Sequence, residues 1–121
     1  MLLEAEGGSG GLSASKVGIN FFRKFYELEK KVYRVEYWDL PGARRYIKMT
    51  ARYAAGSAAI MIVFDRNNRS TFNHVKEWME SIDRSAAPIL VLVSNATSMN
   101  RTKRSVPHSE AQRFAERNKM E

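Results

Sequence analysis

The sequence comprises 121 residues, of which 44% are hydrophobic, with no cysteine and a net charge of +7. This size allows one small domain, and the lack of thiols excludes disulfides, thiolate metal sites, cysteine nucleophiles and thiol lipidation within these residues. The longest apolar run, residues 58–64, is far shorter than the ~20 residues of a membrane-spanning helix. The first residues, MLLEAEGG, lack a basic leader and a long apolar block, so we expect no secretory signal and a cytoplasmic protein.

The positive charge is concentrated in two segments. One holds Arg44, Arg45, Lys48 and Arg52, and the other lies at residues 101–104. Basic clusters attract phosphate-rich partners such as nucleic acid or anionic lipid, although most of them are solvated surface. The sequence has no zinc-ligand pattern, no RNA-binding signature and no helix-turn-helix spacing. A basic nucleic-acid-binding module therefore remains only an alternative.

Residues 1–15 are rich in Gly, Ser and Ala and include GGSGG, a composition typical of a flexible lead-in. A phosphate loop needs Gly, four residues and then Gly-Lys-Ser/Thr, because backbone amides surround the phosphates and the Lys reaches the terminal ones. Leu12 and Ser13 stand where the second Gly would fall, and the nearby Lys16 follows a Ser. We therefore expect no phosphate loop here, and place the folded domain at residues 16–121.

A β-hairpin is predicted at the start of this domain. Residues 18–28 and 32–40 are aromatic-rich and strand-like, and the polar residues 29–31 form the turn between them. The segment ARRYIKMTARYAA, residues 43–55, follows with the spacing of a helix.

Two buried strands and two helices complete the chain. The unbroken apolar runs at residues 57–65 and 88–95 are typical of strands covered on both faces. Between them a helix is expected from Ser70, its N-cap, with one apolar face formed by Phe72, Val75, Trp78 and Ile82. The last helix is expected within residues 106–120, with Ser109 as its cap and an inward face of Ala111, Phe114 and Ala115. This β-β-α-β-α-β-α order predicts an α/β fold whose sheet is mostly parallel, with one antiparallel edge strand.

The segment WDLPG, residues 38–42, joins the second strand to the first helix. A strand that ends in Asp-x-x-Gly before a helix is a phosphate-sensing arrangement, in which the Asp holds a magnesium-bound water and the Gly N–H contacts a terminal phosphate. The alternative is purely structural: Asp39 caps the turn and Gly42 supports it. Pro41 stiffens the segment in either case.

The order of elements and the motifs together resemble the Ras superfamily, and the Rab branch in particular. KVGINFFRKFYELEKKVYRVEYWDLPGARRY resembles the Rab switch I strand, the hairpin and the WDTAGQERF element. MTARYAAGSAAIMIVFDRNNRSTFNHVKEWMESI is similar to the Rab stretch from the switch II helix into the following strand and helix. PILVLVSNATS resembles the strand that leads to the guanine-reading NKxD motif. The resemblance implies the three-layer, P-loop NTPase-like fold of small GTPases, binding of GTP or GDP with Mg²⁺, and a role in vesicle traffic on endomembrane surfaces through effector recruitment.

The resemblance also implies which residues would form the nucleotide site. Asp39, Gly42 and Asn95 match nucleotide-binding positions, and Asp39 matches the metal-binding one. Four other positions depart from the family: Lys16 replaces a magnesium-binding Thr, Ala43 the water-orienting Gln, and Ala96 and Ser98 the base-contacting Lys and Asp. The resemblance does not cover the family's phosphate loop, last strand or lipid-accepting Cys, so the implied fold is incomplete. We therefore expect no catalytic residue, no measurable GTP hydrolysis, and weak nucleotide binding without a preference for guanine.

The retained surface is expected to bind proteins through the hairpin and the first helix, residues 19–55. Tyr37, Trp38, Arg44 and Arg45 are the candidate contact residues, because Rabs use aromatic residues around their switches in this way. A core position for the two aromatic residues is an equally open alternative. A further alternative for the whole chain is a piece of an active GTPase whose phosphate loop lies outside these residues.

The implied fold raises a problem at the centre of the sheet. In the family, the strand before the phosphate loop lies between the WDLPG strand and the strand at residues 57–65. The only apolar run within residues 1–15 is Met1, Leu2 and Leu3, so we expect no such strand. The slot would be closed by direct pairing, by the N-terminal segment or by another chain. Since unpaired buried backbone groups cost ~1–3 kcal/mol each, we expect a marginally stable monomer that self-associates through exposed strand edges.

Overall fold

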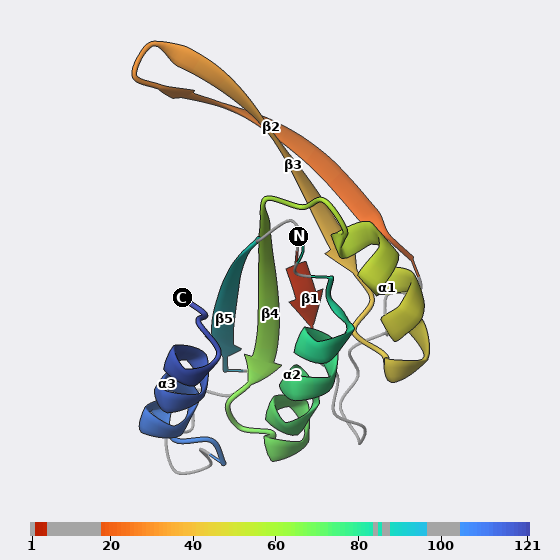
Figure 1. Cartoon of the computed structure of the whole chain (residues 1–121), viewed down its shortest axis with the longest axis vertical. Coiled ribbons are helices and arrows are strands. Elements are labelled where there is room, and N and C mark those ends of the chain that lie inside the picture. The colour runs from red at the N-terminus through yellow and green to blue at the C-terminus, as the bar shows by residue number, and fades with distance from the viewer. Residues whose placement is uncertain (1, 5–17, 84, 86–87, 97–104) are drawn as a thin grey trace.

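A computed structural model describes residues 2–4, 18–83, 85, 88–96 and 105–121, and shows an α/β fold built on one five-stranded sheet. The strand order is β2-β3-β1-β4-β5, in which β2 and β3 are antiparallel and the other neighbours are parallel (Figure 1). The expected fold class is confirmed. The five strands are β1 (Leu2–Glu4), β2 (Asn20–Leu28), β3 (Lys31–Leu40), β4 (Ala59–Asp65) and β5 (Ile89–Asn95). The helices are the 3-10 helix η1 (Arg44–Tyr46), α1 (Ile47–Ala54), α2 (Arg69–Ser81) and α3 (His108–Arg117).

The expectation that no strand fills the centre of the sheet is wrong. β1 lies between β3 and β4, and its three residues pair in parallel with both: Leu3, for example, lies opposite Leu40 and Ile62. The N-terminal segment therefore closes the slot, and the backbone groups of β3 and β4 that it faces are paired. Because a strand needs only backbone partners on each side, three residues suffice where composition predicted a lead-in. Residues 5–15 of that expected lead-in lie outside the described residues.

The β2–β3 hairpin extends well beyond the helices (Figure 1). Its strands pair without interruption from Asn20 opposite Asp39 to Leu28 opposite Lys31. The turn consists of Glu29 and Lys30, whose φ angles of 51° and 63° are both positive. Two consecutive positive φ angles characterise the type I′ turn, whose twist matches that of the flanking strands. The turn is therefore one residue shorter than predicted, because Lys31 already belongs to β3.

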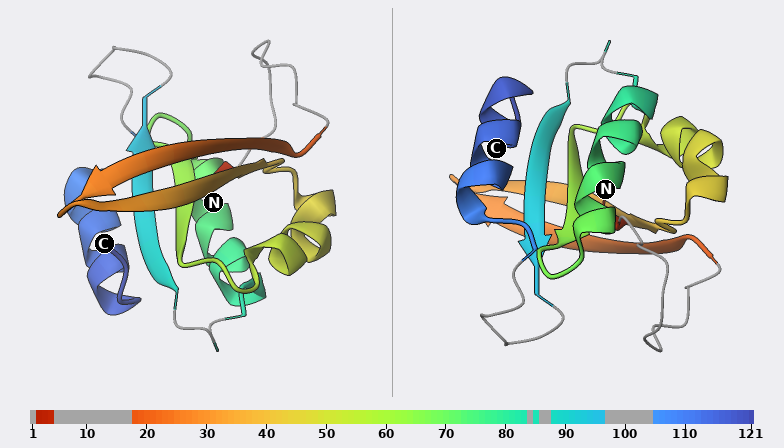
Figure 2. Two further views of the ribbon diagram at one scale, coloured as in Figure 1. Left: turned by 90° about the horizontal axis from the view of Figure 1, so that it is seen from above. Right: turned by 90° about the horizontal axis from the view of Figure 1, so that it is seen from below.

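The core lies between the sheet and the helices. The apolar face predicted for α2 is confirmed, since Phe72, Val75, Trp78 and Ile82 are all buried. Figure 2 shows α1 and α2 over the same side of the sheet. The N-cap of α2 is Asn68, whose side chain accepts the Ser70 N–H, so the prediction of Ser70 as the cap is wrong. The sheet contributes the buried side chains of Leu40, Ile60, Ile62, Phe64 and Leu90.

Helix α3 packs beside β5 and completes the core. Ala111 is buried, and Phe114 lies 5.4 Å from Phe72 of α2 between ring centroids, which confirms the predicted inward face. Pro107 rather than Ser109 occupies the N-cap position. After α3, Glu121 pairs with β5 through two backbone hydrogen bonds, donating its N–H to Leu90 (2.8 Å) and accepting the N–H of Leu92 (2.9 Å).

Candidate protein-interaction surface

The WDLPG segment ends β3 at the carboxyl edge of the sheet. Asp39 is half-buried at this edge, and the Nδ2 of Asn20 in the neighbouring strand donates to its Oδ2 over 3.4 Å. Gly42 is buried within residues 41–43, which lead into η1. The next residue, Ala43, occupies the N-cap position of η1 and makes no side-chain capping bond. The contact given for Asp39 is thus internal to the protein, and Gly42 is buried.

Asn95 lies at the same carboxyl edge, at the end of β5. Its carbonyl accepts the Arg66 N–H over 3.0 Å, and its side-chain Oδ1 accepts the N–H of Ala96 over 2.8 Å. Asp65, opposite Asn95, accepts the Asn67 N–H over 2.9 Å and so supports the turn after β4. Asn95 therefore joins the loops that follow β4 and β5.

Asp39 and Asn95 cannot contact the same ligand group. The sheet register places Asp39 level with Met61, and Met61 level with Val91, four residues before Asn95. With ~3.3 Å per residue along a strand and ~4.8 Å between strands, the two side chains are separated by roughly 19 Å. Within the described part of the chain, no three His, Cys, Asp or Glu side chains gather as metal ligands. Asp39 therefore belongs to no such group, and Ser98 and Lys16 lie outside the described residues.

Three aromatic side chains form a continuous row on the face of the hairpin next to α1. The Trp38 ring lies 4.7 Å from the ring of Phe21 in β2 and 5.6 Å from that of Tyr53 in α1, between centroids. Trp38 is half-buried, whereas Phe21 and Tyr53 are 44% and 43% exposed. We call Phe21, Trp38 and Tyr53 the aromatic cluster. It is an exposed apolar surface whose centre is fixed by two flanking rings, a composition typical of protein interfaces.

Tyr37 does not belong to this cluster, although sequence grouped it with Trp38. Consecutive residues of a strand point to opposite faces, and Tyr37 stacks on Phe22 of β2 with ring centroids 4.6 Å apart and nearly parallel planes. Its hydroxyl lies 2.8 Å from that of Tyr26. This hydrogen bond raises the pKa of the Tyr37 phenol above its ordinary value. The grouping is corrected accordingly: the two residues contribute to two different surfaces.

The arginines of the predicted surface differ in their contacts. Arg44 binds Glu77 of α2 with two nitrogens, Nε to Oε2 over 2.9 Å and Nη2 to Oε1 over 3.0 Å, and so ties η1 to α2. Arg45 is exposed, and its guanidinium lies 4.7 Å from the ring centroid of Tyr46. Lys48 and Arg52 of α1 are exposed as well. Basic side chains of η1 and α1 are therefore exposed, in the same segment that supplies Tyr53 to the aromatic cluster.

The sequence indicated Trp38 but missed its two neighbours. Phe21 could have been found from the hairpin register, because two strands joined by a short turn at residues 29 and 30 bring residues 21 and 38 opposite each other. Tyr53 carried no such signal, since its position depends on how α1 packs against β3.

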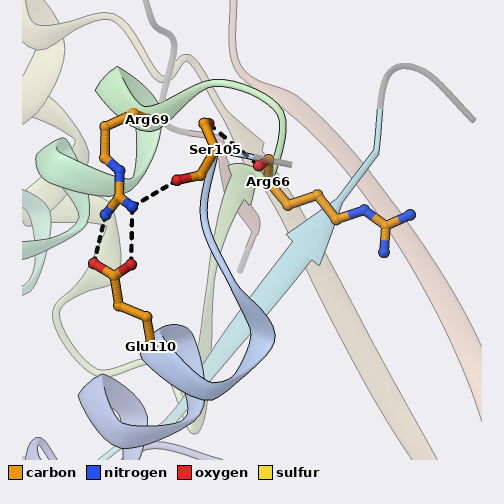
Figure 3. Close-up of polar contacts among 4 residues, drawn as sticks. All are labelled: Arg66, Arg69, Ser105 and Glu110. Carbon is orange, nitrogen blue, oxygen red and sulfur yellow. Dashed lines mark hydrogen bonds and ion pairs between the residues drawn. The ribbon is translucent and has the colours of Figure 1, made fainter. Parts of the chain in front are cut away.

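A separate polar cluster joins α2 to α3 (Figure 3). Arg69 binds both carboxylate oxygens of Glu110 and also donates to the carbonyl of Ser105. The Ser105 N–H in turn donates to the Arg66 carbonyl over 3.1 Å, while the Arg66 side chain points away from the cluster. The Arg69 guanidinium holds the pKa of the Glu110 carboxyl below its usual range. This cluster fixes the chain before α3, and we assign it a structural role.

Comparison with known proteins identifies the family. A family model described as the Ras family matches residues 12–121 of the sequence. The chain belongs to the Ras family. Among curated relatives of this Ras-family chain is the GTP-binding protein YPT1 of Saccharomyces cerevisiae, 37% identical over 108 residues, which are 88% of this chain and 52% of the yeast protein. The Ras-related protein RABE1e of Arabidopsis thaliana is 33% identical over 102 residues, 83% of this chain and 47% of the plant protein.

These relatives show that this Ras-family chain is Rab-like, as the sequence motifs implied. The chain spans about half the length of the curated relatives it matches. In the described part of the chain, the structure has no helix that is long and apolar enough to cross a membrane.

Proposed function

We propose that this Rab-like chain acts in vesicle traffic as a protein-binding module that does not hydrolyse GTP. The observation that carries the proposal is the aromatic cluster: it is exposed, internally fixed, and includes Tyr53 of α1, a helix that also exposes Lys48 and Arg52. Asp39 and Asn95 of the nucleotide motifs, by contrast, make internal contacts. Vesicle traffic and peripheral association with endomembranes come from the Rab resemblance.

Ala43 supports the loss of hydrolysis. The family resemblance places a Gln here to orient the attacking water, and a methyl group has no donor or acceptor for that purpose. Ala96 supports the loss of guanine recognition, because it replaces the base-packing Lys, and Asn95 uses its side-chain oxygen on the Ala96 N–H. Both substitutions lie inside the region that matches the family.

The exposed basic side chains of η1 and α1 indicate the chemistry of the protein partner. Arg45, Lys48 and Arg52 are exposed, while Arg44 is bound to Glu77. Aromatic and arginine side chains are the commonest sources of binding energy in interfaces, and like-signed charges at the border select a partner of opposite sign. The partner segment is therefore expected to be apolar at its centre and acidic at its border.

Nucleotide titration tests the first half of the proposal. Fluorescent GTP and GDP are titrated with Mg²⁺ into the purified chain, with the matching adenine nucleotides as controls. We expect no guanine-selective binding with a dissociation constant below about 1 μM, and no single-turnover hydrolysis above that of a protein-free control. Guanine-selective binding tighter than this would contradict the proposal and would favour the alternative, a piece of an active GTPase.

Affinity capture with two neighbouring variants tests the second half. Trp38→Ala removes the centre of the aromatic cluster, whereas Tyr37→Ala removes a ring of similar burial on the opposite face of the same strand. If the aromatic cluster binds partners, Trp38→Ala loses at least about tenfold in recovered partner, equivalent to ~1.4 kcal/mol, and Tyr37→Ala retains binding. Equal recovery by both variants, each shown to be folded by circular dichroism, would contradict this surface.

A further inference from the structure

The outer edge of β2 is a long backbone surface available for pairing. β2 is the terminal strand of the sheet, and all nine of its residues are exposed. Within the described part of the chain, its only strand partner is β3, so the N–H and C=O groups on its outer side face no other strand. The hairpin also extends beyond the helices, which leaves this edge sterically accessible (Figure 1).

This edge lacks several of the features that usually prevent edge-to-edge association. Natural edge strands are interrupted by proline or a bulge, are kept short, or carry charged side chains, and β2 has only the last of these, at Arg23, Lys24 and Glu27. β2 contains no proline, pairs one-to-one with β3 over its full length, and carries exposed aromatic side chains such as Phe22 and Phe25. The opposite edge of the sheet differs, because Glu121 already pairs with β5 there.

The side chains of β2 are complementary to a second copy of β2 in one register. Two copies related by a two-fold axis perpendicular to the sheet pair antiparallel, and residues on the same face must oppose each other. If the axis passes through Arg23 or Lys24, that residue faces its own copy and like charges are opposed, which is destabilising. If it passes through Phe25, Phe25 faces Phe25, Arg23 faces Glu27 twice, and Phe22 faces Leu28.

The Phe25 register also suits the existing contacts of these residues. Glu27 has no ion pair within the described part of the chain, so its carboxylate is available to a second copy. Arg23 contacts Glu36 through Nε (3.3 Å) and Nη2 (3.0 Å), while its side chain remains 45% exposed. Moving the axis to Tyr26 would oppose Phe25 with Glu27, and Arg23 would then face Glu29, which lies in the turn beyond β2.

We propose that two copies of this chain associate through antiparallel pairing of their β2 strands, centred on Phe25, so that the two sheets become continuous. The contact uses one strand edge and its side chains, which is smaller than the ~800 Å² per partner of a stable interface. The dimer is therefore weak and concentration-dependent, with a dissociation constant in the micromolar range. The aromatic cluster remains largely outside the contact, because Trp38 belongs to β3 and Tyr53 to α1, and only Phe21 belongs to β2.

Cysteine cross-linking reads the register directly, since the chain has no cysteine of its own. Directly opposed residues of antiparallel strands have Cα atoms ~4.5–5.5 Å apart, within the range that a disulfide bridges. Phe25→Cys is therefore expected to form a covalent dimer under mild oxidation at least about tenfold faster than Lys24→Cys or Tyr26→Cys, whose diagonal separation is ~7–8 Å. All three side chains are exposed, so the variants are expected to fold. Equal rates for the three variants, or fastest cross-linking of Lys24→Cys, would overturn the proposal.

A charge exchange provides an independent test by sedimentation velocity. Arg23→Glu and Glu27→Lys each oppose like charges twice in their own dimers, so each is expected to sediment as a monomer. An equimolar mixture restores both opposite-charge pairs, and is expected to dimerise as the unaltered chain does over about 1–500 μM. A monomeric unaltered chain across this range, or a mixture that stays monomeric with both variants folded, would overturn the proposal.

Discussion

The three-residue strand β1 is the point at which the sheet is most easily disrupted, and Leu3→Pro tests this. Leu3 lies opposite Leu40 of β3 and Ile62 of β4, in the middle of the sheet. Proline has no N–H, so the substitution removes a ladder hydrogen bond and leaves a carbonyl of a neighbouring strand without its donor. Proline is therefore essentially excluded from central strands.

The expected loss of stability is large for a domain of this size. An unsatisfied buried acceptor costs ~1–3 kcal/mol, and the proline ring also prevents close approach of the neighbouring strand. A total near 3 kcal/mol is a substantial part of the ~6–15 kcal/mol available to a domain of this length. At roughly 3–5 °C per kcal/mol for this chain length, the melting temperature falls by about 10–15 °C.

Thermal melts followed by circular dichroism at equal protein concentration measure this change. Leu3→Ile is the matched control, because it keeps the N–H and an apolar strand-forming side chain, and its melt is expected to stay close to that of the unaltered chain. A Leu3→Pro melting temperature within about 2 °C of the control would show that β1 contributes little, and would refute its assignment as the structural centre of the sheet.

Three further outcomes follow from the core and from the two perturbed side chains. Trp78 is fully buried, and its Nε1 has no hydrogen-bond partner in the described part of the chain, so Trp78→Ala is expected to cost ~3–5 kcal/mol in urea denaturation and Trp78→Phe much less. The lowered pKa of Glu110 means that its contribution to stability is complete above the unfolded-chain pKa and is lost as the pH falls through the folded-state pKa. The stability of Glu110→Gln should therefore not show this loss at acid pH. An acid-unfolding transition identical to that of the unaltered chain would contradict this prediction. The raised pKa of Tyr37 has the opposite effect: its contribution to stability is present below the unfolded-chain pKa and is lost as the pH rises through the folded-state pKa. Tyr26→Phe removes the hydrogen bond, so the Tyr37 phenol should ionise at a lower pH, which ultraviolet absorbance measures.

Much of the fold could be predicted because its signals are local. Apolar runs identified β4 and β5, and the spacing of Phe72, Val75 and Trp78 identified the buried face of α2. β1 could not be predicted from composition, because three residues carry no periodicity and its pairing depends on β3 and β4. The helix caps were misplaced for a similar reason: Asn68 and Ser70 are both good capping residues, and only the path of the chain after β4 decides between them.

The candidate surface was predicted in outline and not in detail. Trp38 was identified through the motif, but its grouping with Tyr37 ignored the alternation of side chains along a strand. Arg44 was expected to face a partner; it is exposed, and it also binds Glu77 of α2. That contact depends on the orientation of η1 relative to α2, which no local pattern in the sequence encodes.

The position of β1 also sets the order in which the protein is completed during its synthesis. Leu2–Glu4 is made before its partners, which lie roughly 40 and 60 residues further along in β3 and β4, and this closure costs more entropy than that of a hairpin. The β2–β3 hairpin closes over two residues, and hairpins form in ~1–10 μs. At ~5–20 residues per second, β1 waits on the order of 3–12 s before β4 has been made. Ribosome-arrested chains of increasing length would show this order, with protection of the N-terminal segment from proteolysis arising only once residue 65 has emerged. β1 precedes the β2–β3 hairpin in the chain but is therefore built into the sheet after it.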